Sequence, residues 1–153
     1  MATINLTQRN DVTNPNSQVE GSYPVKKRTL IFDAAAGTLT KGSALAANDV
    51  AQLINIKAGT FVLAVSYKVL AVEGGTFTFS VGDGASTAGY ASAINGNTLA
   101  EGVSFNATTT PALGVGKYYS ADDTIDLLVA SGAPAKARVA VTVAYFNMNP
   151  AGV

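Results

Sequence analysis

The chain has 153 residues, with ten basic and ten acidic side chains and neither cysteine nor histidine. Because the charges cancel, nothing draws the whole molecule to nucleic acid or to an anionic membrane. The missing residue types remove disulfides, thiol nucleophiles, imidazole bases and nearly every zinc, copper or iron site. We therefore expect no nucleic-acid partner, no membrane partner, no metal and no cofactor.

The composition favours a single β domain. Hydrophobic residues make up 48% of the chain, largely Ala and Val, and fifteen glycines indicate short strands joined by tight turns. Only 13% of the residues are charged, which is unusual for a free monomer because charge keeps a surface dispersed. We expect other subunits to cover part of the surface.

Residues 1–27 form a polar, asparagine-rich lead without helical or strand periodicity. They predict an extended N-terminal arm, followed by a single β-sandwich domain over residues 28–153. Such an arm could reach on the order of 85 Å, and it is either a disordered terminus or a segment that orders on a neighbouring subunit. The lead lacks the apolar core of a signal peptide and no apolar run approaches membrane-span length, so we expect a soluble protein made in a cytoplasm.

The first expected strand, Thr29–Phe32, follows the basic run Lys26, Lys27 and Arg28. Three cations at the start of a strand are either a phosphate-binding patch or, more commonly, a solvated edge that discourages sheet-to-sheet aggregation. Residues 44–51 resemble a helix, but two turns are marginal in isolation. We expect a short strand over residues 50–56 instead.

The clearest pattern in the chain is a predicted hairpin. The long strand Phe61–Val72 has no Gly or Pro, and a reversal at Glu73-Gly74-Gly75 leads into Thr76–Val81, in which apolar and hydroxyl side chains alternate strictly. Gly82-Asp83-Gly84 then ends the strand. The weakly patterned stretch from residue 85 to about residue 116 is a functional surface or contains short strands, of which Leu99–Phe105 is the best defined.

A second hairpin is expected in the last third of the chain. Strands over Thr124–Ala130 and Lys136–Phe146 are separated by a Gly- and Pro-containing turn, and the second strand has Val139, Val141, Val143 and Tyr145 on one face. Its other face is small or polar and suits either solvent or a close contact with another subunit. Seven or eight strands without a convincing helix predict an all-β, antiparallel sandwich or barrel.

The acidic residues are the main candidates for chemistry, and they fit turns better than a metal site. Asp83, Asp122, Asp123 and Asp126 supply too few oxygen ligands at regular spacing for calcium, whereas Asp in a turn bonds nearby backbone N–H groups. No phosphate loop, nucleophile elbow or dinucleotide fingerprint is present in the sequence. We expect no catalytic residue, no cofactor-binding or metal-binding residue, and no enzyme activity.

Three segments carry a resemblance to a known family. The order Asp49–Val62, then Val81–Gly84, then Tyr119–Leu127 running into a closing strand resembles small structural proteins of tailed-bacteriophage heads, over about residues 49–146. The resemblance implies a capsid decoration (cement) protein of jelly-roll-like fold. Such a protein binds the outer capsid surface of the virion as a homotrimer, or as a homodimer, and stiffens the shell by bridging major capsid proteins. It has no catalytic site.

Residues 1–27 lie outside that resemblance. We nevertheless expect Tyr23, Lys26, Lys27 and Arg28 to contact a neighbouring subunit. Two alternatives remain open. One is a carbohydrate- or receptor-binding module at a virion surface, in which Tyr90, Tyr118 and Tyr119 stack on sugars. The other is a cupin-like enzyme, although cupins normally bind their metal through histidine and this chain has none.

Overall fold

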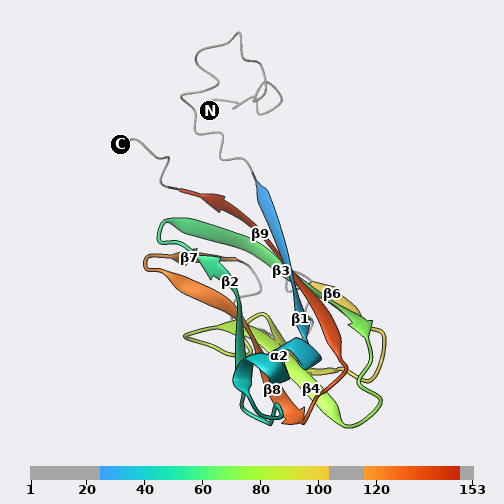
Figure 1. Ribbon diagram of the computed structural model, residues 1–153. Coiled ribbons are helices and arrows are strands. Elements are labelled where there is room, and N and C mark those ends of the chain that lie inside the picture. The colour runs from blue at the N-terminus through green and yellow to red at the C-terminus, as the bar shows by residue number, and fades with distance from the viewer. Residues whose placement is uncertain (1–24, 104–115, 149–153) are drawn as a thin grey trace, which may run out of the picture.

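The computed structural model describes residues 25–103 and 116–148, which form two antiparallel sheets packed face to face (Figure 1). The first sheet contains β1 (Lys26–Asp33), β9 (Arg138–Asn147), β3 (Thr60–Ala71) and β6 (Glu101–Val103), and β7 (Lys117–Tyr119) also pairs with β3. The second sheet contains β2 (Val50–Ile56), β8 (Asp123–Gly132), β4 (Phe77–Asp83) and β5 (Ala91–Asn95). The expected all-β sandwich is confirmed.

The strand order has the winding of a jelly roll. Apart from the short β7, the strands pair as β1 with β9, β2 with β8, β3 with β6 and β4 with β5, and these pairs alternate between the two sheets. One long antiparallel ribbon rolled around a common core produces this order. As a result, β1 and β2 are edge strands of different sheets.

Both predicted hairpins are wrong, although all four of their strands exist. β3 belongs to the first sheet and β4 to the second, and β8 and β9 are divided in the same way. Each connecting turn therefore crosses from one sheet to the other. The reason is that each pair buries its apolar faces against the same core from opposite sides, and the alternation of side chains is identical for a hairpin and for a crossing turn.

The two crossing connections are tied to each other by one side chain. The Glu73 carboxylate accepts hydrogen bonds from the backbone N–H groups of Ala135 at 2.9 Å, Lys136 at 2.8 Å and Ala137 at 2.7 Å. Burial opposes ionisation of Glu73, but these three donors and the nearby charge of Lys136 outweigh it, so the pKa of the carboxyl is lowered. Glu73 thus ties the connection between β3 and β4 to the connection between β8 and β9.

The core lies between the sheets and is built from the inward-facing residues of the central strands. Phe77, Phe79 and Val81 of β4 are fully or almost fully buried and face Val139, Val141 and Val143 of β9 across the interior. Phe79 packs edge-on against Tyr67, with ring centroids 5.7 Å apart. The period-2 alternation seen in the sequence is therefore the burial pattern of the folded strands.

A short helix, α2 (Ala34–Lys41), corrects the expectation that the chain contains no helix. Asp33 caps its first turn by accepting hydrogen bonds from the N–H groups of Ala35 at 3.0 Å and Ala36 at 3.3 Å, and Gly42 ends it with φ 74°. Eight residues are too few to form a helix alone. The caps and the burial of Ala34 stabilise a helix that is too short to be expected from the sequence alone. The expected strand over residues 50–56 is confirmed as β2.

The weakly patterned stretch contains two short strands. β6 lies inside the expected strand Leu99–Phe105, whose last two residues fall outside the described part of the chain. β5 was not anticipated, because its five residues carry no clear alternation. Within residues 25–103 and 116–148, no helix is long and apolar enough to cross a membrane.

Candidate functional site

The basic run predicted as an interface lies on a free edge of the first sheet. Lys26, Lys27 and Arg28 form the start of β1, where they pair with Tyr145, Ala144 and Val143 of β9, and all three side chains are exposed. Tyr23, the fourth predicted interface residue, lies outside the described residues. Since β1 begins at Lys26, the last two residues of the expected arm belong to the sheet.

These three cations are not neutralised within the part of the chain that the structure describes. Five other basic residues form ion pairs: Lys41 with Asp49, Lys57 with Asp122, Lys68 with Glu101, Lys117 with Asp83, and Arg138 with Asp33. The remaining described acids are engaged elsewhere or buried. No ion pair is found for Lys26, Lys27 or Arg28 among the residues described, so the start of β1 is a local concentration of positive charge.

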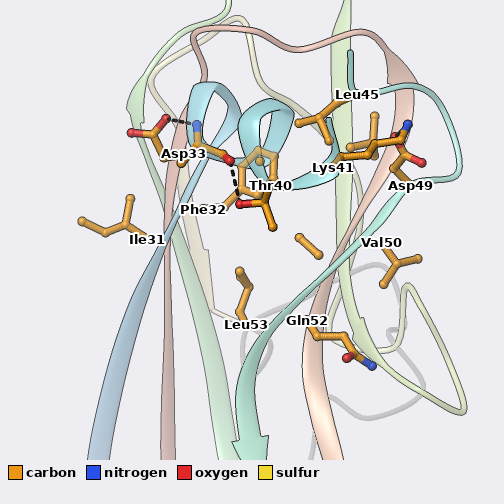
Figure 2. Close-up of a pocket in the computed structure, with 14 residues that line it drawn as sticks. Ile31, Phe32, Asp33, Thr40, Lys41, Leu45, Asp49, Val50, Gln52 and Leu53 are labelled. Atoms are coloured by element: carbon orange, nitrogen blue, oxygen red, sulfur yellow. Dashed lines mark hydrogen bonds and ion pairs between the residues drawn. The ribbon is translucent and has the colours of Figure 1, made fainter. Parts of the chain in front are cut away.

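A groove of about 530 Å³ lies between β1 and β2, beneath α2 (Figure 2). Its apolar lining includes Ile31 and Phe32 from β1, Val50 and Leu53 from β2, and Leu45 from the loop after α2. Ile31 is 45% exposed and Val50 is 47% exposed, which is high for large aliphatic side chains beside a core. We call this feature the β1–β2 groove.

The end of the β1–β2 groove near α2 is fixed by an ion pair. The Lys41 ammonium lies 2.5 Å from the Asp49 carboxylate, which also accepts a hydrogen bond from the N–H of Ala46 at 2.8 Å. The bond from Lys41 and the bond from Ala46 hold the pKa of Asp49 below its usual range. This end of the groove is therefore polar and held by an ion pair.

Both strands that flank the groove have one unpaired side. β1 pairs only with β9, and β2 only with β8, among the strands of residues 25–103 and 116–148. An edge strand presents a row of N–H and C=O groups to which another extended segment can bond. The cations are evident in the sequence, but the groove is not, because its lining comes from segments that only the tertiary fold brings together.

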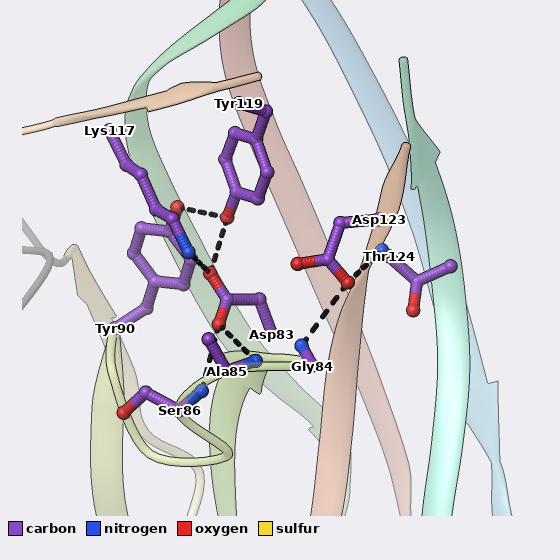
Figure 3. A network of polar contacts seen from close by, with 9 residues as sticks. All are labelled: Asp83, Gly84, Ala85, Ser86, Tyr90, Lys117, Tyr119, Asp123 and Thr124. Atoms are coloured by element: carbon purple, nitrogen blue, oxygen red, sulfur yellow. Dashed lines mark hydrogen bonds and ion pairs between the residues drawn. The ribbon is translucent and has the colours of Figure 1, made fainter. Parts of the chain in front are cut away.

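A second feature is a buried polar network between the two sheets (Figure 3). One oxygen of Asp83 accepts a hydrogen bond from the Tyr119 hydroxyl at 2.6 Å and lies 2.6 Å from the Lys117 ammonium. Its other oxygen accepts the N–H groups of Ala85 at 3.0 Å and Ser86 at 2.9 Å. The Asp83 carboxylate, which is 0% exposed, is therefore fully hydrogen-bonded and joins β4 to β7.

The contacts of the network shift the pKa values of its members in opposite directions. Burial opposes ionisation of Asp83, but the bonds from Lys117, Tyr119 and Ser86 outweigh it and lower the pKa of its carboxyl. Burial, the bond to Asp83 and the contact with Tyr90 raise the pKa of the Tyr119 hydroxyl. Both oxygens of the ionised Asp83 carboxylate therefore already accept hydrogen bonds from the protein's own donors.

The tyrosines proposed to stack on sugars do not form a surface. Tyr90 and Tyr119 are buried, and their hydroxyls lie 2.8 Å apart inside the network. Only Tyr118 of the three presents its ring to solvent, with 48% exposure. A sugar platform needs exposed aromatic faces, so this arrangement does not support the carbohydrate-binding alternative.

Of the four acidic residues predicted to bond nearby backbone N–H groups, Asp83 and Asp123 do so. Asp83 bonds the N–H groups of Ala85 and Ser86 in its own loop, and Asp123 accepts that of Thr124 at 2.8 Å. Asp122 instead accepts the N–H of Ala58 at 2.9 Å, from a segment far away in the sequence. Asp126 differs. It is buried on β8, one of its carboxylate oxygens has no partner within the described residues, and burial raises its pKa. In the described part of the chain, no three His, Cys, Asp or Glu residues are grouped to hold a metal ion.

Comparison with protein-family models and with curated proteins finds no match. Among solved structures, similar folds occur in three phage capsids. A chain of the cyanophage Pam1 capsid asymmetric unit is 23% identical, with a TM-score of 0.57 over 82% of this chain and 85% of that one. A chain of the Ralstonia phage GP4 capsid is 16% identical, with a TM-score of 0.60 over 83% and 86%. A chain of the acid-stable capsid of Helicobacter pylori bacteriophage KHP30 is 15% identical, with a TM-score of 0.50 over 83% and 91%. At these identities the finding is a shared fold, which extends over most of each chain.

Proposed function

We propose that this protein is a decoration (cement) protein of a tailed-phage virion, which binds the outer surface of the capsid and stabilises the shell by bridging major capsid proteins. The observation that carries the proposal is the fold shared with chains of three phage capsid structures over at least 82% of this chain. The resemblance of residues 49–146 to phage head proteins points the same way.

The chemistry of the described residues fits a structural role. The best-assembled polar cluster, around Asp83, is saturated by donors from its own chain and links the two sheets. A protein of this kind acts through the area it covers and through repetition of one standard-sized contact at many sites of a lattice. A low-charge surface supports such contacts, because little desolvation of charge is needed to cover it.

The contact with the shell is assigned to the arm, including Tyr23, and to the adjoining cations Lys26, Lys27 and Arg28. The three cations have no ion-pair partner among the described residues, so an acidic partner surface would complement them. Self-association as a homotrimer, or as a homodimer in second place, would cover more of the apolar surface under closed symmetry. Light scattering on the purified protein tests this part independently.

Binding to shells tests the proposal directly. Purified protein is mixed with phage shells that lack it, the shells are sedimented, and the bound copies are counted against major capsid protein. We expect saturable binding at a fixed ratio and a higher temperature of shell disruption. No binding, or binding without a plateau, would contradict a decoration role.

The arm is tested by a deletion that ends at residue 24. A longer deletion would remove Lys26 from β1 and confuse loss of contact with loss of folding. We expect the truncated protein to keep the melting temperature of the full chain but to occupy fewer sites on the shell. Unchanged occupancy would show that the arm does not contribute.

A further inference from the structure

The β1–β2 groove and the free edge of β1 lie next to each other and share one strand. Ile31 and Phe32 of β1 line the groove, and the first three residues of the same strand are Lys26, Lys27 and Arg28. In Figure 2, β1 and β2 descend on either side of the groove from the end that α2 covers. An extended segment lying along β1 would therefore reach both the cations and the apolar groove.

The groove is suited to aliphatic side chains. Its volume of about 530 Å³ has an aliphatic lining that includes Ile31, Val50, Leu53 and Leu45, and its polar lining comes from Asp33, Thr40, Lys41, Asp49 and Gln52. Ile31 and Val50 remain about half exposed when the groove is empty, and their burial by a partner would be favourable at about 25 cal/mol per Å² of apolar surface. The groove by itself does not identify the partner.

The three cations at the start of β1 indicate the charge of the partner. Lysine on an edge strand protects against uncontrolled pairing, but here the basic residues cover only the first part of β1. The second part, beside the groove, has one charged residue, Asp33, whose carboxylate already caps α2 and pairs with Arg138. Such an edge repels basic segments and admits an acidic one, which is how a protective charge also provides specificity.

We propose that β1 and the β1–β2 groove accept an extended segment of a shell subunit by strand addition. The segment carries acidic residues, which lie beside Lys26, Lys27 and Arg28 while its backbone bonds the free edge of β1. Its apolar end enters the groove beside Ile31 and Val50. Backbone bonds supply affinity in this mode of recognition, and side chains in pockets supply specificity. The identity of the partner rests on the proposed function.

Two groove variants test the apolar half of the proposal. Ile31→Lys and Val50→Lys place an ammonium where the partner would bury aliphatic groups, and each should weaken shell binding by about tenfold or more. Leu39→Lys is the matched control, because Leu39 is 82% exposed on α2 and does not line the groove. All three changes are at exposed positions, so the free variants should melt with the wild type.

A series of charge-removing variants tests the electrostatic half of the proposal. Lys27→Gln and Arg28→Gln should each slow association and reduce the dependence of binding on salt, because they remove steering charge. Lys136→Gln is the control, since no ion pair is found for Lys136 either among the described residues, and it lies on the connection between β8 and β9. Lys136→Gln should leave both the association rate and the salt dependence of binding unchanged.

Hydrogen exchange on the full chain separates strand addition from a simple surface contact. Amides of residues 26–33 that point away from β9 should exchange at least tenfold more slowly on the shell than in solution. If the wild type binds but Ile31→Lys and Val50→Lys bind like Leu39→Lys, and β1 exchange is unchanged, this inference is overturned while the decoration role stands. If these amides are already protected in the free protein and deleting residues 1–24 exposes them, the chain's own N-terminal segment is the occupant and the assignment to a shell segment is wrong. If the wild type does not bind shells, both proposals fail.

Discussion

Removal of one hydroxyl group, by Tyr119→Phe, tests how the two sheets are held together. The Tyr119 hydroxyl donates its only hydrogen to Asp83 at 2.6 Å, so at the 2.8 Å contact with Tyr90 it must accept. The phenylalanine variant keeps the ring in the core. It therefore removes the bond to a buried carboxylate and also leaves the buried Tyr90 hydroxyl without an acceptor.

The expected loss follows from these two bonds. A hydrogen bond to an ionised group contributes about 1.5–3 kcal/mol, and a buried hydroxyl left without a partner costs about 1 kcal/mol more. Lys117 and the two loop N–H groups still stabilise the carboxylate, so the network is weakened but not dissolved. We expect a destabilisation of about 2.5–4 kcal/mol, which lowers the melting temperature of a chain of this size by at least about 5 °C.

Thermal and urea unfolding, followed by circular dichroism, measure this loss. The control is Tyr118→Phe, which removes a hydroxyl from the neighbouring residue on β7, whose ring is 48% exposed. We expect the control to lie within about 0.5 kcal/mol of the wild type. If the two variants unfold together, the network does not stabilise the junction between β4 and β7 and the reasoning is refuted.

Three further perturbations follow from the same coordinates. The carboxyls of Asp83 and Glu73 have lowered pKa values in the folded state, so the stability they contribute is present above their unfolded pKa and is lost as the pH falls through their folded pKa. The melting temperature should therefore decrease when the pH is lowered below about 5. A melting temperature that does not change with pH in this range would contradict this prediction. Asp126 has a raised pKa, so its stabilising contribution is lost as the pH rises. Asp126→Asn should therefore melt at a higher temperature than the wild type at pH 7, and this difference in melting temperature should disappear in acid. An equal difference at every pH would exclude the charge of Asp126 as the cause. Gly132→Ala would bring a Cβ to 1.8 Å from the Thr76 carbonyl oxygen at φ 85°, and should cost about 3 kcal/mol or more in urea unfolding. The matched Gly74→Ala, at φ 80° with nothing within 4 Å, should cost only about 1 kcal/mol, and equal losses would mean that the close approach is relieved.

Most strands could be predicted from the sequence because alternation directly records which side chains are buried. Val139, Val141 and Val143 were placed on one face, and all three are fully buried. Their pairing could not be predicted in the same way. A turn such as Glu73-Gly74-Gly75 reverses the chain equally well within a sheet or between sheets, and only the packing of both apolar faces on one core selects the crossing.

The α2 helix shows a different limit. Its eight residues include three alanines, which favour a helix, but also a glycine and two threonines, which do not, and the segment is short. Asp33 and Gly42 stabilise it as caps, and the burial of Ala34 holds it against the end of the sandwich. Such short elements are decided by tertiary contacts, which local pattern does not contain.

For the candidate site, the sequence by itself determined the absence of thiol and imidazole groups, the all-β class and the position of the basic run. Whether Lys26, Lys27 and Arg28 are neutralised depends on which acids the fold brings near them, and the ion pairs among the described residues all involve other cations. The groove needs Ile31 and Val50, nineteen positions apart, on edge strands of different sheets. Composition and periodicity act along the chain, whereas charge pairing, edges and cavities arise between segments, and for that reason only the tertiary structure decided them.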